Sequence, residues 1–142
     1  ELLHARGILP DGLAFVMPES DALPDSRPIA ELISPVARDA TLYLALPHYQ
    51  PGGPNCVGAE TRYAPEERKL VDENAGTEER AVVLGRKNFR LLLENELTAE
   101  YSALPIGRVM RDGAGNLVYD PDFIPPLMTM QGSRRLLVMV QR

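Results

Sequence analysis

The chain has 142 residues, 44% of them hydrophobic, which is enough to form one domain with a buried core. Its formal net charge is −5, with acidic and basic residues interspersed, so a surface for nucleic acid or an anionic membrane is not expected. It has no apolar run long enough to span a bilayer, and its single cysteine, Cys56, excludes disulfides within the chain and is typical of a reducing compartment such as the cytoplasm.

The first predicted element is a hairpin. Strand-like runs at 2–9 and 13–17 flank the turn Pro10-Asp11-Gly12, whose residues favour a reversal of the chain. Residues 18–28, which contain two prolines at their ends and a third within, are expected to form an irregular crossing.

A buried strand and a polar strand are predicted next. The run 41–46 is almost entirely apolar and ends at Pro47, as expected for a strand buried on both faces. A Gly/Pro loop at 51–55 separates it from 62–71, which is consistent with a polar strand. The chain then turns at 72–76.

The segment 86–97 fits two structures. Phe89, Leu92, Leu93 and Leu97 fall on one helical face, and periodicity by itself favours a helix. Alternate residues from Phe89 through Leu91 to Leu93 fit a strand equally well in composition.

A second hairpin is predicted towards the end of the chain. Strand-like runs at 104–111 and 117–119 flank the turn-forming residues 112–116. Pro105 indicates that the first of these strands begins nearby or lies on a sheet edge. Many short strands with regular turns predict a mainly β fold, an antiparallel β-sandwich.

The sheet region is expected to end at the stretch Phe123-Ile124-Pro125-Pro126. Two consecutive prolines cannot lie inside a strand or a helix, and each restricts the preceding residue to extended geometry. We therefore predict that the chain leaves its sheet there as a stiff connector.

The last residues predict the start of a helix. Ser133 can cap it, and the apolar residues Leu136, Leu137, Met139 and Val140 recur at spacings of three and four. An apolar stripe of only two or three helical turns is too short to form a stable helix by itself. The chain also starts at residue 1 without a methionine. We therefore expect the sequence to be a piece of a longer protein. The alternatives are that these residues pack back onto their own sandwich, or form a strand through Leu136, Val138 and Val140.

The sequence predicts no catalytic, metal or cofactor site. His4 and His48 lack the spacing of metal ligands, and Cys56 has no nucleophile signature around it. Paired carboxylates such as Asp120 and Asp122 are more typical of turns and solvated surfaces than of acid-base chemistry. A small hydrolase that uses His48 or a carboxylate pair is the enzymatic alternative, and it requires a concave pocket with perturbed pKa values.

Six short pieces follow one another across almost the whole chain. They are Leu9-Pro10-Asp11-Gly12 with Phe15, Leu42-Tyr43-Leu44-Ala45-Leu46-Pro47, residues 72–76, Asn88-Phe89-Arg90-Leu91-Leu92, Ala103-Leu104-Pro105-Ile106-Gly107-Arg108-Val109, and Phe123-Ile124-Pro125-Pro126. In order and spacing they resemble the TssK family, the baseplate component of the bacterial type VI secretion system that is also called ImpJ or VasE. The piece at 123–126 is the most distinctive of them.

The resemblance implies a cytoplasmic, non-enzymatic homotrimer that works as a structural adaptor. Members of the family have an N-terminal β-sandwich shoulder similar to that of phage receptor-binding proteins, a helical neck and a C-terminal head. The shoulder side attaches to the wedge proteins TssF and TssG, and the head contacts the membrane-complex proteins TssL and TssM. The shoulder of a phage baseplate or receptor-binding protein is the alternative within the same architecture.

On this resemblance, residues 1–126 form the shoulder without the family's N-terminal segment, and residues 127–142 form a linker and the first turns of the neck. The head lies outside the sequence. The resemblance makes 88–93 a strand, against the helical periodicity. It also implies that Phe123, Ile124, Pro125 and Pro126 connect shoulder and neck, and that Leu136, Leu137 and Val140 start a neck helix that packs against other neck helices and symmetry mates.

Overall fold

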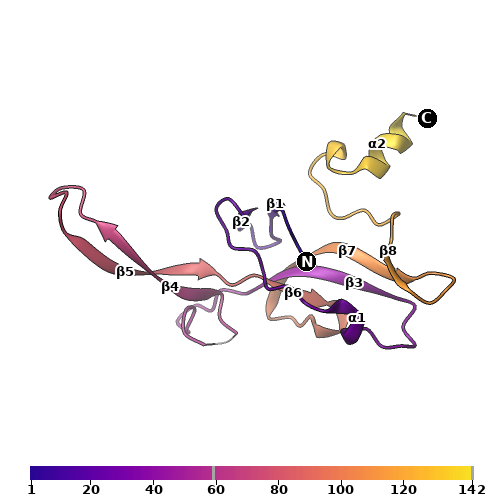
Figure 1. The fold of residues 1–142 in the computed structure, drawn as a ribbon, viewed down its shortest axis with the longest axis horizontal. Coiled ribbons are helices and arrows are strands. Elements are labelled where there is room, and N and C mark those ends of the chain that lie inside the picture. Colours follow the sequence, from indigo (N-terminus) through magenta and orange to yellow (C-terminus); the bar gives the residue numbers. More distant parts are fainter. Residues whose placement is uncertain (59, 142) are drawn as a thin grey trace.

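A central antiparallel sheet organises the chain in the computed structural model, which describes residues 1–58 and 60–141. Its strand order is β6-β3-β7-β8 (Figure 1). The strands are β3 (Asp39–Pro47), β6 (Arg90–Leu93), β7 (Tyr101–Arg111) and β8 (Leu117–Tyr119). The predicted mainly β, antiparallel fold is confirmed, together with the hairpin of β7 and β8.

The predicted N-terminal hairpin is present and covers one part of the sheet. It consists of β1 (Ala5–Ile8) and β2 (Ala14–Met17). Gly12, in the turn between them, has φ +87°, a conformation that glycine adopts without strain. The buried residues between hairpin and sheet are Leu9, Phe15, Met17, Leu44, Leu46, Phe89 and Leu91. This packing gives the two layers of a small sandwich.

Strand β3 is the most deeply buried element, as its apolar composition predicts. Leu44, Ala45 and Leu46 have no exposed surface. A second apolar cluster of Ile33, Leu42, Leu93 and Val109 lies beside the first. It is covered in part by the short helix α1 (Ile29–Leu32), which ends the irregular crossing. The core therefore follows β3 from Leu42 to Leu46.

The segment 86–97 contains a strand, so the prediction from family resemblance is confirmed and the one from helical periodicity is wrong. β6 pairs with β3, with Leu91 opposite Leu44 and Leu93 opposite Leu42. Leu91, Leu92 and Leu93 are all buried, so both faces of the strand are covered. A strand buried on both faces does not alternate apolar and polar residues, which is why its pattern imitates a helix. A single 3₁₀ turn, Glu94–Glu96, follows it.

Pro105 lies within β7 rather than at its start, because the strand begins at Tyr101. β8 pairs only with residues 109–111, so β7 is an edge strand at Pro105, as the sequence predicts. The pairing with β3 also shifts there, with Gly107 opposite Leu42 and Pro105 opposite Tyr43. The irregularity accommodates a residue that cannot donate a backbone hydrogen bond.

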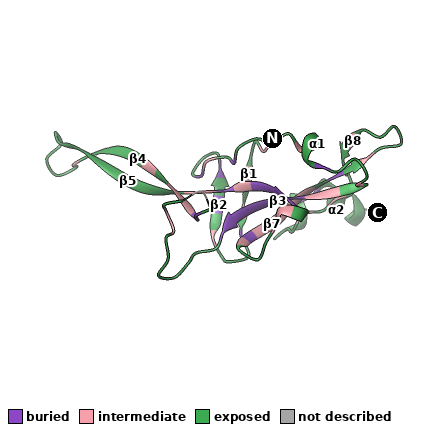
Figure 2. Cartoon of the chain, turned by 90° about the horizontal axis from the view of Figure 1, so that it is seen from below, coloured by how far each residue is buried: buried purple, intermediate pink, exposed green. Residues whose placement is uncertain are grey.

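A long two-stranded arm projects from the body of the molecule (Figure 1). It consists of β4 (Tyr63–Val71) and β5 (Glu79–Lys87), joined by the predicted turn at 72–76. The sequence predicts the polar strand β4 but not β5. Almost every residue of β5 is exposed (Figure 2), so it lacks the alternating pattern that a half-buried strand shows.

The C-terminal residues form the predicted helix. A 3₁₀ turn (Met130–Gly132) precedes helix α2 (Arg134–Val140), and the Ser133 hydroxyl accepts a hydrogen bond from the Leu136 N–H at 3.4 Å. The alternative of a strand through Leu136, Val138 and Val140 is wrong. Figure 1 shows α2 away from the sheet, and most of its apolar side chains remain exposed.

Within the described part of the chain, no helix combines the length and the apolar character that crossing a membrane requires.

Candidate functional site

The connector between sheet and helix is the candidate site, because the predicted interface residues lie on it and on α2. Residues 123–127 belong to no helix or strand, as the two prolines predict. Phe123 and Pro125 are half-buried, whereas Ile124 and Pro126 are exposed. One side of the connector is therefore partly buried, and the other side is exposed to solvent.

The first end of the connector is fastened to β7. The Arg108 Nε–H donates to Asp120 Oδ2 at 2.7 Å, and the Asp120 N–H donates to the Arg108 carbonyl at 2.8 Å. Asp120 Oδ1 in turn accepts from the Asp122 N–H at 2.9 Å. This is the turn that the sequence predicts for Asp120, and the contact with Arg108 adds an anchor on the sheet.

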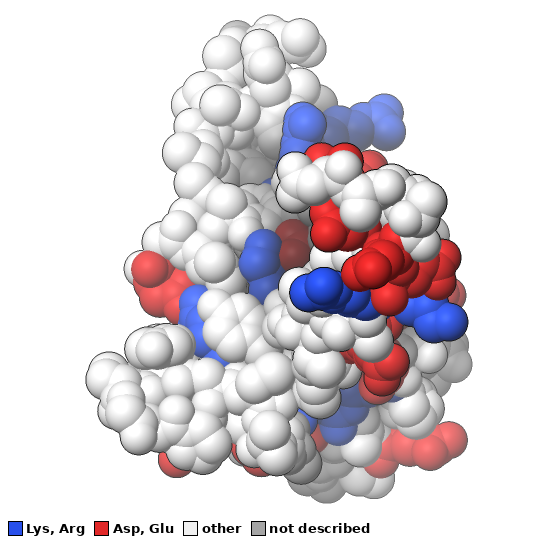
Figure 3. Space-filling model, turned by 90° about the vertical axis from the view of Figure 1, so that its left-hand side faces the viewer, with Lys and Arg blue, Asp and Glu red and all other residues white. Residues whose placement is uncertain are grey.

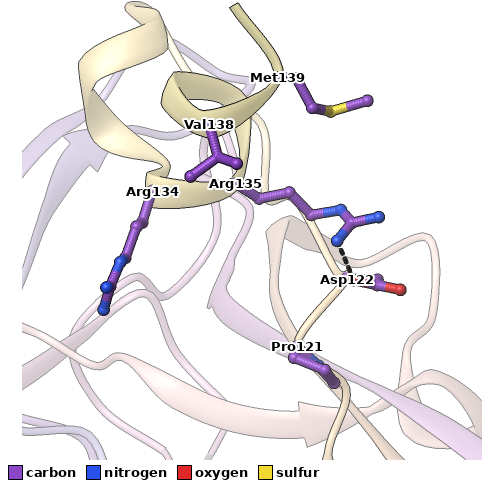
Figure 4. A pocket seen from close by; sticks show the side chains of 6 residues that line it. All are labelled: Pro121, Asp122, Arg134, Arg135, Val138 and Met139. Atoms are coloured by element: carbon purple, nitrogen blue, oxygen red, sulfur yellow. Dashed lines mark ion pairs between the residues drawn. The ribbon is translucent and has the colours of Figure 1, made fainter. Parts of the chain in front are cut away.

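The other end of the connector is fastened to α2. An ion pair joins Asp122 to Arg135 in the first turn of the helix (Figure 4). An open hollow of about 400 Å³ lies between connector and helix. It is lined by Pro121, Asp122, Arg134, Arg135, Val138 and Met139. The two ion pairs thus join the connector to β7 at one end and to α2 at the other.

Sequence reasoning missed the ionic part of this site. It assigned Asp120 and Asp122 to the turn and did not consider Arg108 or Arg135. The sequence did contain a signal for these ion pairs. Two carboxylates precede the connector, and two consecutive arginines, Arg134 and Arg135, follow it.

The carboxyl group of Asp120 is held in its charged form. The hydrogen bond from the Asp122 N–H, then the hydrogen bond and charge of Arg108, lower its pKa below the usual value, although desolvation opposes them. A carboxyl whose pKa is lower in the folded state stabilises that state above its unfolded pKa, and this contribution disappears as the pH falls through the folded value.

We expect Asp120→Asn to destabilise residues 1–142 at pH 7 and to have a smaller effect at pH 3. The reason is that pH 3 lies below the ordinary pKa of an aspartate, so the unfolded carboxyl is already mostly protonated and the advantage of the charged, folded carboxylate is reduced. Urea unfolding of both proteins at the two pH values measures the difference. An equal loss at both pH values would mean that Asp120 acts through its shape and not its charge.

The apolar residues predicted for the neck lie on α2 and are mostly uncovered. Leu136 is half-buried, whereas Leu137 and Val140 are exposed, Val140 by 64%. The preceding turn is tightly packed, because a Cβ on Gly132 would lie 2.8 Å from Leu127 Cδ2. The turn before α2 is thus well packed, but the described residues bury little of the helix's apolar surface.

The histidines and the cysteine considered for catalysis lie at exposed positions or in a loop. His4 and His48 are exposed, Cys56 lies half-buried in a loop, and the described residues contain no group of three side chains able to hold a metal ion. The pKa of Glu96 is lowered chiefly by its hydrogen bonds from Arg27, both at 2.7 Å. Such pairing keeps a carboxylate ionised and is typical of a structural contact, so it gives no support to the hydrolase alternative.

Comparison with known families shows a match along the whole sequence. Residues 1–142 match the family described as bacterial type VI secretion, EvfL, ImpJ, VasE. Among curated proteins, the chain is similar to the type VI secretion system baseplate component TssK1 of Pseudomonas aeruginosa PAO1. The two are 35% identical over 134 residues, which is 89% of this chain and 29% of that protein.

Solved structures agree with this match. A crystal structure of TssK has 31% identity and a TM-score of 0.81, over 99% of this chain and 32% of that one. A cryo-electron microscopy structure of the TssK-TssF-TssG baseplate subcomplex has 26% identity and a TM-score of 0.80, over 97% of this chain and 47% of that one. The chain thus spans less than half the length of each of these relatives.

Proposed function

Because the chain belongs to the bacterial type VI secretion family ImpJ/VasE, the TssK family, we propose that it is the shoulder of a baseplate adaptor. The observation that carries the proposal is the likeness to TssK over 99% of the chain, with a TM-score of 0.81. The family match favours this assignment over the shoulder of a phage receptor-binding protein.

The division of the chain into shoulder and neck is part of the proposal. Residues 1–126 are the shoulder, and 127–142 are the linker and first turns of the neck. In support, both apolar clusters consist of residues before the connector. The exposed apolar residues Leu137, Val138, Met139 and Val140 are the surface that further neck helices and symmetry mates would cover.

The partners follow from the family. We propose that the shoulder side of the full protein binds TssF and TssG, the proteins found with TssK in the baseplate subcomplex, and that the head, outside this sequence, contacts TssL and TssM. The protein acts in the cytoplasm as a homotrimer, without catalytic activity, cofactor, nucleic acid or membrane insertion. A net charge of −5 with interspersed signs is consistent with protein partners.

The mechanism is one of connection. The sandwich is a platform, the connector sets the exit direction through Asp120 and Asp122, and the neck carries the head at a defined position. A flexible linker in place of the connector would let the head occupy a larger volume and would lower its effective concentration at the second partner.

Solution mass tests the proposal directly. Light scattering after size exclusion should give a monomer or a weak oligomer for residues 1–142 and a trimer for a longer version that includes the complete neck. The trimer should also retain a TssF–TssG complex on an affinity column. Monomers in both cases would contradict the neck assignment, and a trimer that retains no TssF–TssG would contradict the proposed partners.

Phe123→Ala in the full-length protein is expected to loosen the neck against the shoulder, because Phe123 is half-buried whereas its neighbour Ile124 is exposed. Cleavage at the connector by a protease should become several-fold faster, since exposed and mobile segments are cut preferentially. Met128→Ala, at an 84% exposed position just after the connector, is the matched control. Unchanged cleavage together with unchanged trimer stability would show that Phe123 is no anchor.

A further inference from the structure

Strand β6 forms one edge of the central sheet, and its own sequence does little to prevent pairing with another chain. It pairs with β3 on one side, and no described strand pairs with its other side. An edge strand presents N–H and C=O groups to which a strand of another chain can bond, and proteins commonly protect such edges with charged residues, prolines or very short strands. Of the four residues of β6, only Arg90 is charged, and three leucines follow it.

The other edges of the central sheet and of the arm carry such protection within their strands. The opposite edge of the sheet consists of β8, of three residues, and of the part of β7 that contains Pro105. The arm strands β4 and β5 contain four charged residues each. Charged side chains of both signs are visible at the arm end of the molecule (Figure 3). Protection of β6 therefore has to come from residues outside the strand.

Two side chains bond to the backbone of β6. Arg27 Nη1 donates to the Leu91 carbonyl at 2.8 Å, and Glu96 Oε2 accepts from the Leu93 N–H at 2.8 Å. Arg27 also donates from Nη1 and Nη2 to the two carboxylate oxygens of Glu96, both at 2.7 Å. A continuous chain of hydrogen bonds thus runs from Leu91 to Leu93. We call Arg27 and Glu96 the edge cap.

The edge cap takes the position of a residue in a neighbouring strand. In an antiparallel pair, consecutive residues direct their backbone groups alternately towards the partner strand and away from it. Since Leu91 and Leu93 bond to the cap, they are the residues of β6 that point away from β3. A parallel strand would bond to the same carbonyl and the same N–H through one residue, by its own N–H and C=O. The guanidinium and the carboxylate replace these two groups.

The bonds to the backbone distinguish this ion pair from an ordinary surface pair. The side chains of Arg27 and Glu96 are 29% and 32% exposed, and the charge interaction of such a pair contributes little to stability. An open hollow of about 440 Å³ lies along the strand, lined by the cap and by residues 88–92 among others. The edge is therefore covered by the two side chains and not by a layer of the fold.

We propose that the edge cap keeps this edge of the sheet closed to the β6 strand of a second copy of the chain. The second copy is the occupant because the outward groups are self-complementary. In an antiparallel pair centred on Leu92, Leu91 of each copy lies opposite Leu93 of the other, and each of these residues offers one N–H and one C=O. The device belongs to the fold and does not depend on the adaptor function proposed above.

A cysteine at position 92 reports this pairing in the full-length protein with Cys56→Ser and any other native cysteine replaced. In the antiparallel pair, the two copies of residue 92 form a non-hydrogen-bonded pair with Cα atoms about 4.5 Å apart, within reach of a disulfide. Under oxidation with copper–phenanthroline, Leu92→Cys with the cap intact should give almost no disulfide between copies. Addition of Arg27→Met or of Glu96→Met should raise the linked fraction several-fold.

Two results would overturn the proposal. A disulfide at position 92 with the cap intact would mean that the edge is open in its presence. No disulfide in either uncapped variant would mean that the cap is not what closes the edge. Tyr119→Cys in the Arg27→Met protein is the control, because Tyr119 is 65% exposed on β8, at the opposite edge of the sheet, and it should give no disulfide.

Exchange of the two cap residues separates the backbone contact from the ion pair. R27E/E96R retains one charge of each sign, but it places a carboxylate at the Leu91 carbonyl and a guanidinium at the Leu93 N–H, where neither can bond to the backbone. We expect as much disulfide at position 92 as in the uncapped variants. As little as with the cap intact would show that the ion pair acts only as a tie between the crossing and the sheet, and the proposal would fail.

Hydrogen exchange of the unmodified full-length protein tests the cap without any substitution, so it applies even if a variant fails to fold. The Leu93 amide should exchange about as slowly as the amide of Leu92, which points towards β3, because the Glu96 carboxylate holds it. Exchange at Leu93 more than about tenfold faster than at Leu92 would show an open edge and would overturn the proposal.

Discussion

Replacing Leu46 by alanine is expected to lower the free energy of unfolding of residues 1–142 by about 3 kcal/mol. Leu46 has no exposed surface and lies in the cluster between the β1–β2 hairpin and the sheet. The loss combines the transfer free energy of the deleted atoms with a cavity that the two layers cannot fill. Chemical unfolding followed by circular dichroism measures it.

Val36→Ala is the control for this experiment, because Val36 is 90% exposed. We expect a change of less than about 0.5 kcal/mol. If Leu46→Ala had an effect as small as the control, the hairpin would not pack on the sheet as described.

Arg62→Met is expected to cost about 2 kcal/mol, because the buried arginine loses its ion pair with Asp11 and its hydrogen bond to the Pro47 carbonyl. The side chains of Arg62 and Asp11 are 6% and 20% exposed, and Arg62 also donates to the Pro47 carbonyl at 2.9 Å. The arginine thus ties the first hairpin turn to the end of β3 at the root of the arm. Urea unfolding measures the loss.

A double-mutant cycle isolates the ion pair from the rest of the contact. Asp11→Asn in the Arg62→Met background should cost little more than Arg62→Met alone, because the partner of the carboxylate has already been removed. Additive losses would show that the two side chains stabilise the fold separately.

The parts of the fold that the sequence predicts best are those with strong local chemistry. The hairpin around Pro10-Asp11-Gly12 and the cap at Ser133 are determined by residues close together in the chain. Strand β3 is predicted because a short, almost entirely apolar run that ends at a proline is typical of a buried strand.

The parts that were mispredicted or missed depend on distant residues. β6 is a strand because β3 offers it a pairing edge and both of its faces are covered, which its own periodicity does not show. β5 is a strand because β4 pairs with it, although almost none of its residues is buried. In both cases the partner strand decides the structure.

The candidate site likewise has one part that local sequence predicts and another that depends on distant residues. The lack of a helix or strand at 123–126 follows from Pro125 and Pro126 directly. The ion pairs of Asp120 with Arg108 and of Asp122 with Arg135 required the sheet and the helix to be placed first.

By itself, then, the sequence determined the mainly β class, the two hairpins, the position of the exit from the sheet and, through the order of its short pieces, the family. Only the tertiary structure decided the strand at Arg90–Leu93, the projecting arm of β4 and β5, and the ionic anchors of the connector. The physical reason is that turns and prolines act through local backbone geometry. Strand pairing, burial and ion pairs depend on residues that are far apart in the chain and that only the fold brings together.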